Sequence, residues 1–349
     1  MKKSLIALAV LAVSGAAMAQ SSVTVYGIAD IWFGSVKNEN NQASVDAGAG
    51  AGSISQTVLE SGGVNGSRWG LKGSEDLGGG LKANFKLEQG FKMDTGVAGT
   101  TTSIAGADVA GQAFSREAYV GFSGGFGEVK LGKVWTAYDD VSGASNAVFD
   151  SALAPMNNVF ASIGYLGNPG NTVYYSTPTL GGFGAAVSYT LGENKTATTS
   201  ASDIISLNVS YGAGPLNAQF GYQVEDVGNV SDTKFTRLGA SYDFGVATAK
   251  ATYGKVANVD GVSGDDATDY QIGVDFPVSP ALTVSASYAR SKDSNVGFDQ
   301  ERKGYGIAAA YTLSKRTFLY GGYEADTATN NAAADSKHSV FAVGVQHRF

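Results

Sequence analysis

Two histidines and no cysteine are the residues on which catalytic or metal chemistry of this chain would have to rest. A hydrolase needs a histidine beside a nucleophile, and a metal site needs several ligands close together. His347 lies on the apolar face of an alternating terminal segment, and His338 lies at the start of that segment. The glycines at 78–80 lack the Lys-Ser/Thr of a phosphate loop and indicate a turn. We therefore expect no enzyme, no metal site and no cofactor, with a hydrolase using His338 at a barrel rim as the one catalytic alternative.

Fixed charges on one face of an extended segment offer a different chemistry, which is the attraction of ions. Segment 81–88 alternates between two sets of residues, Leu81, Ala83, Phe85 and Leu87 against Lys82, Asn84, Lys86 and Glu88. Successive side chains of a strand point to opposite faces, so one face is apolar and the other is charged. This pattern is typical of a strand with lipid on one side and water on the other. Lys86 is therefore a candidate lumen residue.

Arg68 is a second candidate by the same alternation. It shares a face with Gly70 and Lys72, whereas Trp69 and Leu71 share the other face. An arginine on the lipid face at the middle of a bilayer costs about 2–4 kcal/mol. We therefore expect Arg68 to point into a lumen and Trp69 to point outward.

Three further basic residues follow less regular patterns. Arg116 is assigned to the lumen, and this assignment turns Glu117 outward, toward a neighbouring subunit or a rim. Lys130 and Lys133 lie three residues apart and have opposite parity. Only one of these two lysines can face the lumen.

The elements that position these residues are alternating segments of about the length that tilted strands need to cross a bilayer. Sixteen are expected, near residues 22–34, 66–75, 80–92, 113–123, 127–136, 171–178, 183–191, 203–212, 216–225, 234–244, 246–256, 268–277, 281–291, 302–313, 316–326 and 338–349. Tight Gly- or Pro-containing turns alternate with long polar loops, such as 35–54, 93–112, 257–267, 292–301 and 327–337. The pattern predicts an all-β fold, a 16-stranded antiparallel transmembrane β-barrel with short periplasmic turns and long outer loops. A barrel this wide cannot be filled by its own side chains, so it encloses a channel.

The two ends of the chain agree with a bacterial outer-membrane barrel. The last strand carries an apolar face and stops at Phe349, the expected barrel-closing residue. At the other end, a basic head, an apolar run over 5–13 and Ala17-Met18-Ala19 predict a signal peptide that is cleaved after Ala19. We therefore expect residues 1–19 to be the cleaved signal peptide and residues 20–349 to form one barrel domain.

Composition narrows the class further. The chain of 349 residues has 48 Gly, 17 Tyr, 17 Phe and only 6 Pro, with a hydropathy near zero. This balance is expected when only every second residue of a strand faces lipid. The net charge of −7 argues against a nucleic-acid partner.

Several motifs resemble the trimeric general porins of Gram-negative bacteria, most closely those of β-proteobacteria. The resemblance spans the mature chain, and its most specific stretch runs from Arg68 to Ala83. The segments that carry it are Ser22-Val23-Thr24-Val25-Tyr26-Gly27 with Asp30, Ser67-Arg68-Trp69-Gly70-Leu71-Lys72-Gly73-Ser74-Glu75-Asp76-Leu77-Gly78-Gly79-Gly80-Leu81-Lys82-Ala83, Ser115-Arg116-Glu117-Ala118-Tyr119-Val120-Gly121-Phe122, Phe126-Gly127-Glu128-Val129-Lys130-Leu131-Gly132-Lys133 and Asn171-Thr172-Val173-Tyr174-Tyr175-Ser176-Thr177-Pro178.

The resemblance implies a homotrimer in the outer membrane, with membrane lipid and lipopolysaccharide around it. It implies that the third long loop, roughly 137–170, folds into the lumen and forms a constriction between basic and acidic walls. Its basic wall would hold Arg68, Arg116, Lys86 and Lys133, and its loop acids would be Asp139, Asp140 and Asp150.

Two departures weaken the implied basic wall. Lys133 stands where relatives usually carry Arg, and the run 168–171 lacks an Arg often found there. We therefore expect only a slight anion preference. The implied function is passive diffusion of small hydrophilic solutes and ions. A substrate-specific channel and a plugged, adhesin-type barrel remain the alternatives.

Overall fold

The computed structural model describes residues 22–40, 52–99, 101–102, 108–109, 112–141, 143–227, 231–294, 299–330 and 333–349. The expected signal peptide at 1–19 lies outside the described residues, as do parts of the outer loops. Within the described part of the chain, no helix combines the length and the apolar character that crossing a membrane requires.

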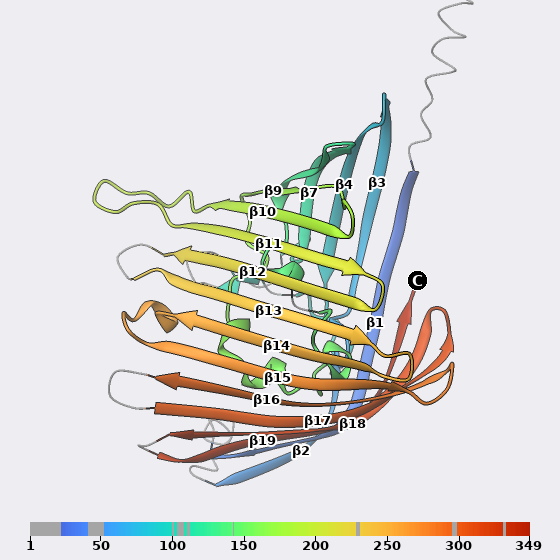
Figure 1. The fold of residues 1–349 in the computed structure, drawn as a ribbon, viewed down its shortest axis with the longest axis vertical. Coiled ribbons are helices and arrows are strands. Elements are labelled where there is room, and N and C mark those ends of the chain that lie inside the picture. The colour runs from blue at the N-terminus through green and yellow to red at the C-terminus, as the bar shows by residue number, and fades with distance from the viewer. Residues whose placement is uncertain are drawn as a thin grey trace, which may run out of the picture.

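One antiparallel sheet of 17 strands makes up the body of the protein, and it closes because β1 pairs with β19 (Figure 1). Its strands are β1 (Ser22–Glu39), β2 (Ser53–Ser61), β3 (Arg68–Gly78), β4 (Leu81–Gly90), β7 (Glu117–Gly124), β8 (Gly127–Lys133), β9 (Thr172–Ser176), β10 (Phe183–Leu191), β11 (Asp203–Ala213), β12 (Leu216–Asp226), β13 (Thr233–Asp243), β14 (Thr248–Ala257), β15 (Asp266–Pro277), β16 (Leu282–Ser294), β17 (Asp299–Ser314), β18 (Thr317–Asn330) and β19 (Ala333–Arg348). The short strands β5 (Thr101–Thr102) and β6 (Asp108–Val109) pair separately. A 3-10 turn, η4 (Val259–Gly261), lies between β14 and β15.

Strands β2 and β3 together occupy one position in the barrel. β2 pairs with residues 31–39 of β1, and β3 pairs with residues 22–28 of the same edge. The barrel therefore has sixteen strand positions, and the predicted fold class is confirmed.

The sequence-based boundaries need two corrections. The sequence pattern does not predict β2, because its serines and threonines give a weak apolar alternation. The strand β1 also continues into the loop expected at 35–54, and the strands β16–β19 continue into the loops expected at 292–301 and 327–337. Polar strands can keep pairing beyond the apolar band, since the ladder satisfies their backbone groups there.

The chain between β2 and β3 is held against the inner wall by one carboxylate. Asp30 is fully buried and accepts hydrogen bonds from the backbone N–H groups of residues 63–65, at 2.9–3.2 Å. Its two oxygens also accept hydrogen bonds from the Tyr320 hydroxyl at 2.6 Å and from Gln346 Nε2 at 2.8 Å. Asp30 thus joins β1, β18 and β19 to the β2–β3 connection.

Phe349 lies at the closing seam. Its backbone N–H and C=O each form a 3.1 Å hydrogen bond with Gly27. A Cβ on Gly27 would lie 2.3 Å from Cζ of Phe349, so only glycine leaves room for the aromatic ring there. The last residue therefore completes the ladder and covers the backbone of the first strand.

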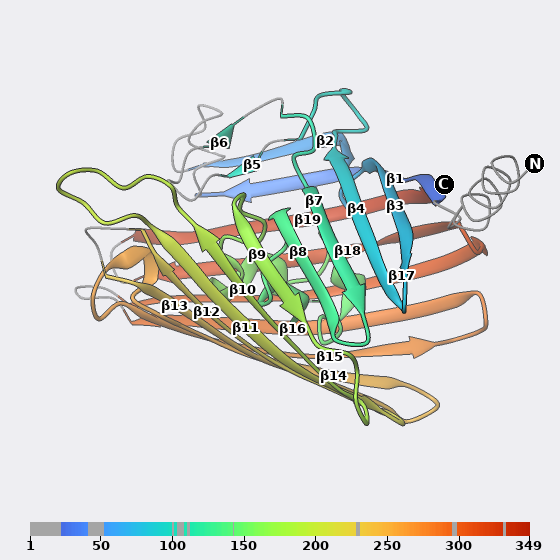
Figure 2. The same cartoon turned by 90° about the horizontal axis from the view of Figure 1, so that it is seen from above.

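The third long loop lies inside the barrel, where both views show its green turns surrounded by strands (Figures 1 and 2). It contains η1 (Asp139–Val141), η2 (Val148–Asp150), α3 (Met156–Val159) and η3 (Ala161–Ile163). These turns contact the inner face from β11 to β17. Much of the buried apolar surface of the molecule belongs to this loop, namely Ala137, Tyr138, Val141, Ala147, Val148, Leu153, Ala154, Met156, Val159 and Phe160.

Candidate functional site: the constriction of the barrel

The loop that narrows the lumen is fixed to the wall by hydrogen bonds along its length. Asp269 on β15 accepts hydrogen bonds from the backbone N–H groups of Ala161 at 3.2 Å and Ser162 at 2.8 Å. The tip of the loop reaches the β2–β3 connection, where the Ala152 N–H donates to the Gly63 carbonyl at 2.8 Å. The loop is therefore fixed at points from β15 to the β2–β3 connection.

A buried arginine holds the same loop from the wall side. Arg237 on β13 is 0% exposed, and its Nη2 donates to the Ser162 carbonyl at 2.5 Å. Its guanidinium lies 4.9 Å from the ring centroid of Tyr138 and 5.5 Å from that of Tyr165. A cation over two desolvated aromatic faces is stabilised by their quadrupoles. Arg237 thus anchors the loop and does not line the water path.

Opposite the loop, the inner faces of β3 and β4 and the turn before β7 carry the residues Arg68, Lys86 and Arg116, which we call the basic wall. Glu88 lies among them. Its carboxylate pairs with Arg116 Nε at 2.7 Å and with Lys86 Nζ at 3.5 Å, and it accepts a 2.8 Å hydrogen bond from the Tyr26 hydroxyl. The basic wall is therefore partly neutralised from within.

Glu117 corrects a prediction. The sequence pattern turns it outward, but it is buried, faces the lumen and pairs with Lys86. β7 begins at Glu117, so Arg116 belongs to the preceding turn and the alternation of the strand does not extend to it. Arg116 and Glu117 can consequently both point inward.

Arg68 differs from its two neighbours on the basic wall. Its Nε donates to the Gly66 carbonyl at 2.9 Å, and within the described residues no carboxylate lies within ion-pair distance of it. Trp69, the next residue, is 40% exposed on the outer face. The charge of Arg68 is therefore the least compensated one of the basic wall.

Asp139 faces this wall from the base of the third loop. It lines a cavity of about 290 Å³ together with Trp135 and Tyr165. The Arg116 guanidinium lies 5.1 Å from the centroid of the Trp135 ring. Burial raises the pKa of Asp139 to about 6, and a 2.6 Å hydrogen bond from the Tyr165 hydroxyl opposes this rise. Asp139 and Arg116 of the basic wall therefore both lie near the indole of Trp135.

Comparison with known proteins decides the family. The model of the Gram-negative porin family matches residues 4–332. The chain belongs to the Gram-negative porin family. Outer membrane porin protein 32 of Delftia acidovorans is 37% identical over 92% of this chain and 88% of its own length. An outer membrane porin protein of Bordetella pertussis is 30% identical over the whole of both chains.

A solved structure supports the same assignment. The anion-selective porin from Comamonas acidovorans superposes with a TM-score of 0.75 and 29% identity, covering 95% of this chain and all of that one. The protein is thus an outer-membrane porin, a β-barrel channel with a polar lumen. Its sixteen-position barrel and inward-folded loop supply the wide passage and the narrow zone of such a channel.

The remaining loop acids of the porin lie in different surroundings. Asp140 accepts hydrogen bonds from the Tyr174 hydroxyl at 2.8 Å and from Asn208 Nδ2 at 3.0 Å, and burial raises its pKa. Asp150 accepts hydrogen bonds from Asn146 and Asn157 of its own loop. The structure therefore holds Asp140 against the β9–β11 wall and ties Asp150 within the loop.

The two ambiguous lysines are separated by register. Lys130 pairs with Gly121 on the inner face, and its Nζ lies 5.4 Å from the Tyr119 ring centroid and 3.2 Å from the Glu128 carboxylate. Lys133 has the opposite parity, and its ammonium contacts the Asn168 carbonyl at the end of the third loop. Lys130 therefore occupies the lumen face, whereas Lys133, assigned to the basic wall from sequence, braces the base of the loop.

Sequence reasoning missed Trp135, Glu88 as a partner of the basic wall, and Arg237. The alternation at 81–88 already placed Glu88 on the face of Lys86, so its role was accessible. Arg237 sits between Gly221 and Gly254 on the neighbouring strands, which leaves space for the loop. A single inward arginine flanked by glycines was the available signal.

Proposed function

We propose that this porin passes small hydrophilic solutes and ions by passive diffusion, with a slight preference for anions set at its constriction. The observation that carries the proposal is the charge balance of the basic wall. Arg68, Lys86 and Arg116 supply three positive charges, and Glu88 and Glu117 remove two of them. One net positive charge in a wet passage gives a weak field, so discrimination between ions is modest.

Reversal potential under a salt gradient tests this proposal. The double variant Arg68→Ala/Arg116→Ala should shift permeability toward cations at low salt. The shift should fade in molar salt, where the Debye length is about 3 Å. Lys82→Ala, which changes an exposed lysine near the turn end of β4, is the matched control. An unchanged potential in the double variant at low salt would remove these arginines from the selectivity zone.

We further propose that the working unit is a homotrimer of chains from which residues 1–19 have been removed. A Vibrio cholerae outer-membrane protein of the same fold, at 17% identity and a TM-score of 0.67, is described in a trimer form. Val23 and Val25 on the outer face of β1 are more than 60% exposed within a single chain, which suits a subunit contact. Light scattering in mild detergent that gives a monomer mass would contradict the trimer.

Lipid of the outer leaflet is the proposed surrounding of the barrel rim. A groove of about 450 Å³ is lined by Lys37, Lys303 and Lys337 together with Tyr288 and Tyr305. Tyrosines at a membrane interface with lysines beside them suit the phosphates of lipopolysaccharide. Loss of co-purifying lipopolysaccharide from Lys303→Ala is the expected result, and full retention would contradict this contact. We assign no catalytic step and no nucleic-acid partner to the porin.

A further inference from the structure

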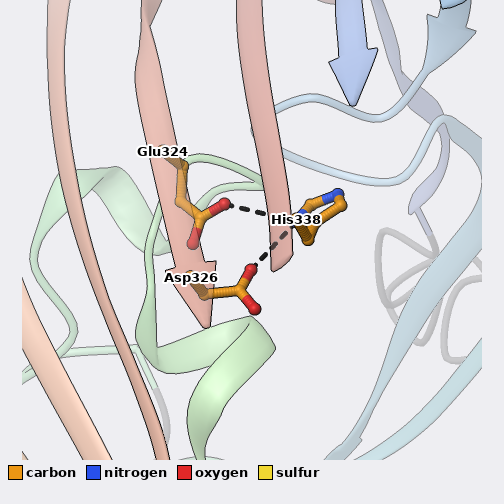
Figure 3. A group of neighbouring side chains, drawn as sticks. All are labelled: Glu324, Asp326 and His338. Carbon is orange, nitrogen blue, oxygen red and sulfur yellow. Dashed lines mark hydrogen bonds and ion pairs between the residues drawn. The ribbon is translucent and has the colours of Figure 1, made fainter. Parts of the chain in front are cut away.

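Three chemically distinct side chains meet on the inner face of the last hairpin. Glu324 and Asp326 lie on β18, and His338 lies on β19 directly opposite Asp326 in the register. Figure 3 shows the three side chains converging, with a green helical turn of the third loop beside Asp326. These residues lie outside the basic wall and outside the anchors of the third loop described above.

The distances suit a shared cation. His338 Nδ1 lies 2.9 Å from Asp326 Oδ2 and 3.5 Å from Glu324 Oε2. One imidazole nitrogen and one oxygen from each carboxylate all lie within 4.8 Å of one another. Two ligand atoms bound to one zinc ion at about 2.0–2.2 Å are roughly 3–3.6 Å apart. A small movement of side chains would complete this geometry.

Glu324 provides an independent reason to expect a ligand. It is 0% exposed, and neither of its carboxylate oxygens accepts a hydrogen bond of good geometry, with His338 Nδ1 at 3.5 Å and the Asn158 side chain of α3 as its polar neighbours. A buried carboxylate without such partners is costly unless a cation or a proton neutralises it. Among the ion pairs of the described side chains, those of Glu324 and Asp326 are both with His338. The guanidinium of Arg302 pairs instead with Asp293 at 3.0 Å.

The cluster lies between the β17 strand and the third loop. On the neighbouring strand β17, Gly304 lies opposite Asp326 and Gly306 opposite Glu324, and the third loop packs over these glycines through Leu153, Pro155 and Val159. The loop helix α3 approaches from the lumen side, with Val159 near Gly304. His338 keeps about a quarter of its side chain exposed, and with Asp326 it lines the groove of about 450 Å³ described above, which leaves a path from water.

We propose that Glu324, Asp326 and His338 form a binding site for a divalent first-row transition cation of the zinc class. Imidazole with two carboxylates suits such ions, whereas calcium requires six to eight oxygen ligands. Three protein ligands leave a position open to water from the lumen. The ion would join β18 to β19 near the end of their hairpin and would neutralise the two carboxylates.

The experiment measures zinc binding to the purified, chelator-treated porin by equilibrium dialysis at neutral pH. We expect one zinc ion per chain in the parent and at least tenfold weaker binding in His338→Ala and in the near-isosteric Glu324→Gln. His347→Ala is the matched control, because His347 lies on the outer face of the same strand and contacts Thr317. This control should bind like the parent, and excess calcium should not displace the zinc.

Two outcomes would overturn the proposal. Absence of stoichiometric binding in the parent would leave the cluster as an imidazolium held by two carboxylates. Parent-like binding in both His338→Ala and Glu324→Gln would place the zinc elsewhere. Cobalt gives a second readout, because its visible absorption bands should appear with the parent and be lost in Glu324→Gln. Circular dichroism checks that each variant keeps the barrel, and if His338→Ala does not fold, Glu324→Gln alone decides.

Discussion

The two inner walls of this barrel use arginine in opposite ways. On the side of β3–β7, Arg116 pairs with the Glu88 carboxylate, and Arg68 donates to the Gly66 carbonyl on the same inner face. On the side of β11–β17, Arg237 lies fully buried beneath the third loop and contacts a carbonyl and two aromatic rings. The first arrangement leaves charge available to solutes, whereas the second uses it to hold a loop.

This difference follows from what covers each wall. The third loop places an apolar cluster of its own residues, including Tyr138, against Phe235, Val256 and Ala267 of the wall. Arg237 is buried by this cover, and its guanidinium is stabilised by the Ser162 carbonyl and the two aromatic rings. The basic wall has no such cover among the described residues, so we expect its field to be the one a passing ion meets. Substitutions that act on one wall and spare the other test this division.

Disrupting the contact between Phe349 and β1 should prevent the barrel from closing, and both inner walls would then be lost. Phe349→Asp replaces the ring above Gly27 with a charge at the edge of lipid, where an open strand edge cannot satisfy its backbone groups. We expect at least a tenfold loss of folded, membrane-inserted porin, measured as heat-resistant protein in outer-membrane fractions. Phe349→Tyr keeps the aromatic ring and should insert normally. Normal insertion of the aspartate variant would contradict a closing role.

Loosening the third loop should affect only the inner wall formed by β11–β17, which this loop covers. Asp269→Ala removes the acceptor of two backbone hydrogen bonds, each worth about 1.5–3 kcal/mol when the acceptor is charged. Hydrogen exchange should show the opening free energy of residues 161–163 falling by roughly 2–4 kcal/mol, with the barrel strands unchanged. Asp293→Ala, which loses a pair with Arg302 on the same wall, is the control. Equal exchange at 161–163 in both variants would argue against the anchor.

Removing the negative charge of Glu88 should increase the net positive charge of the basic wall. Glu88→Gln leaves Arg116 and Lys86 with less compensation, so anion permeability should rise at low salt, opposite in sign to the loss of the arginines. The effect should be modest and should vanish near molar salt. Reversal potential is the measurement, and Glu75→Gln, an exposed residue of β3, is the control. A shift toward cations would mean that Glu88 is not part of the field that ions meet.

The smallest expected effect is a change of anion preference with pH. Burial raises the pKa of Asp139 to about 6, so this acid is charged at pH 8 and mostly neutral at pH 5. Loss of this negative charge beside the basic wall should increase anion preference slightly as pH falls through about 6. Asp139→Asn should be insensitive over the same range. A pH dependence that persists unchanged in Asp139→Asn would assign it to another group.

The same shift has a consequence for stability. The folded-state pKa of Asp139 lies above its usual value of about 3.9 in an unfolded chain. The folded state therefore binds more protons between these values, and its stability decreases as pH rises from about 4 to about 6. Asp139→Asn should flatten this part of the stability curve.

The barrel and the sides of its strands could be predicted from the amino-acid sequence. Alternation is a local property with a period of two residues, so Arg68 and Lys86 could be placed on the lumen face, and Trp69 on the lipid face, without any long-range contact. Lipid makes this pattern strict, because a misplaced charge is expensive. The number of strand positions followed from the same pattern.

The start of each alternation and the surface that the loop covers depended instead on contacts between distant segments. The orientation of Glu117 depended on the residue at which β7 begins, and the burial of Arg237 depended on a loop some 75 residues earlier in the chain. Asp30 and the cluster around His338 likewise combine groups from strands that are brought together by barrel closure. These contacts form only when the folded barrel brings the segments together, and no local spacing encodes them.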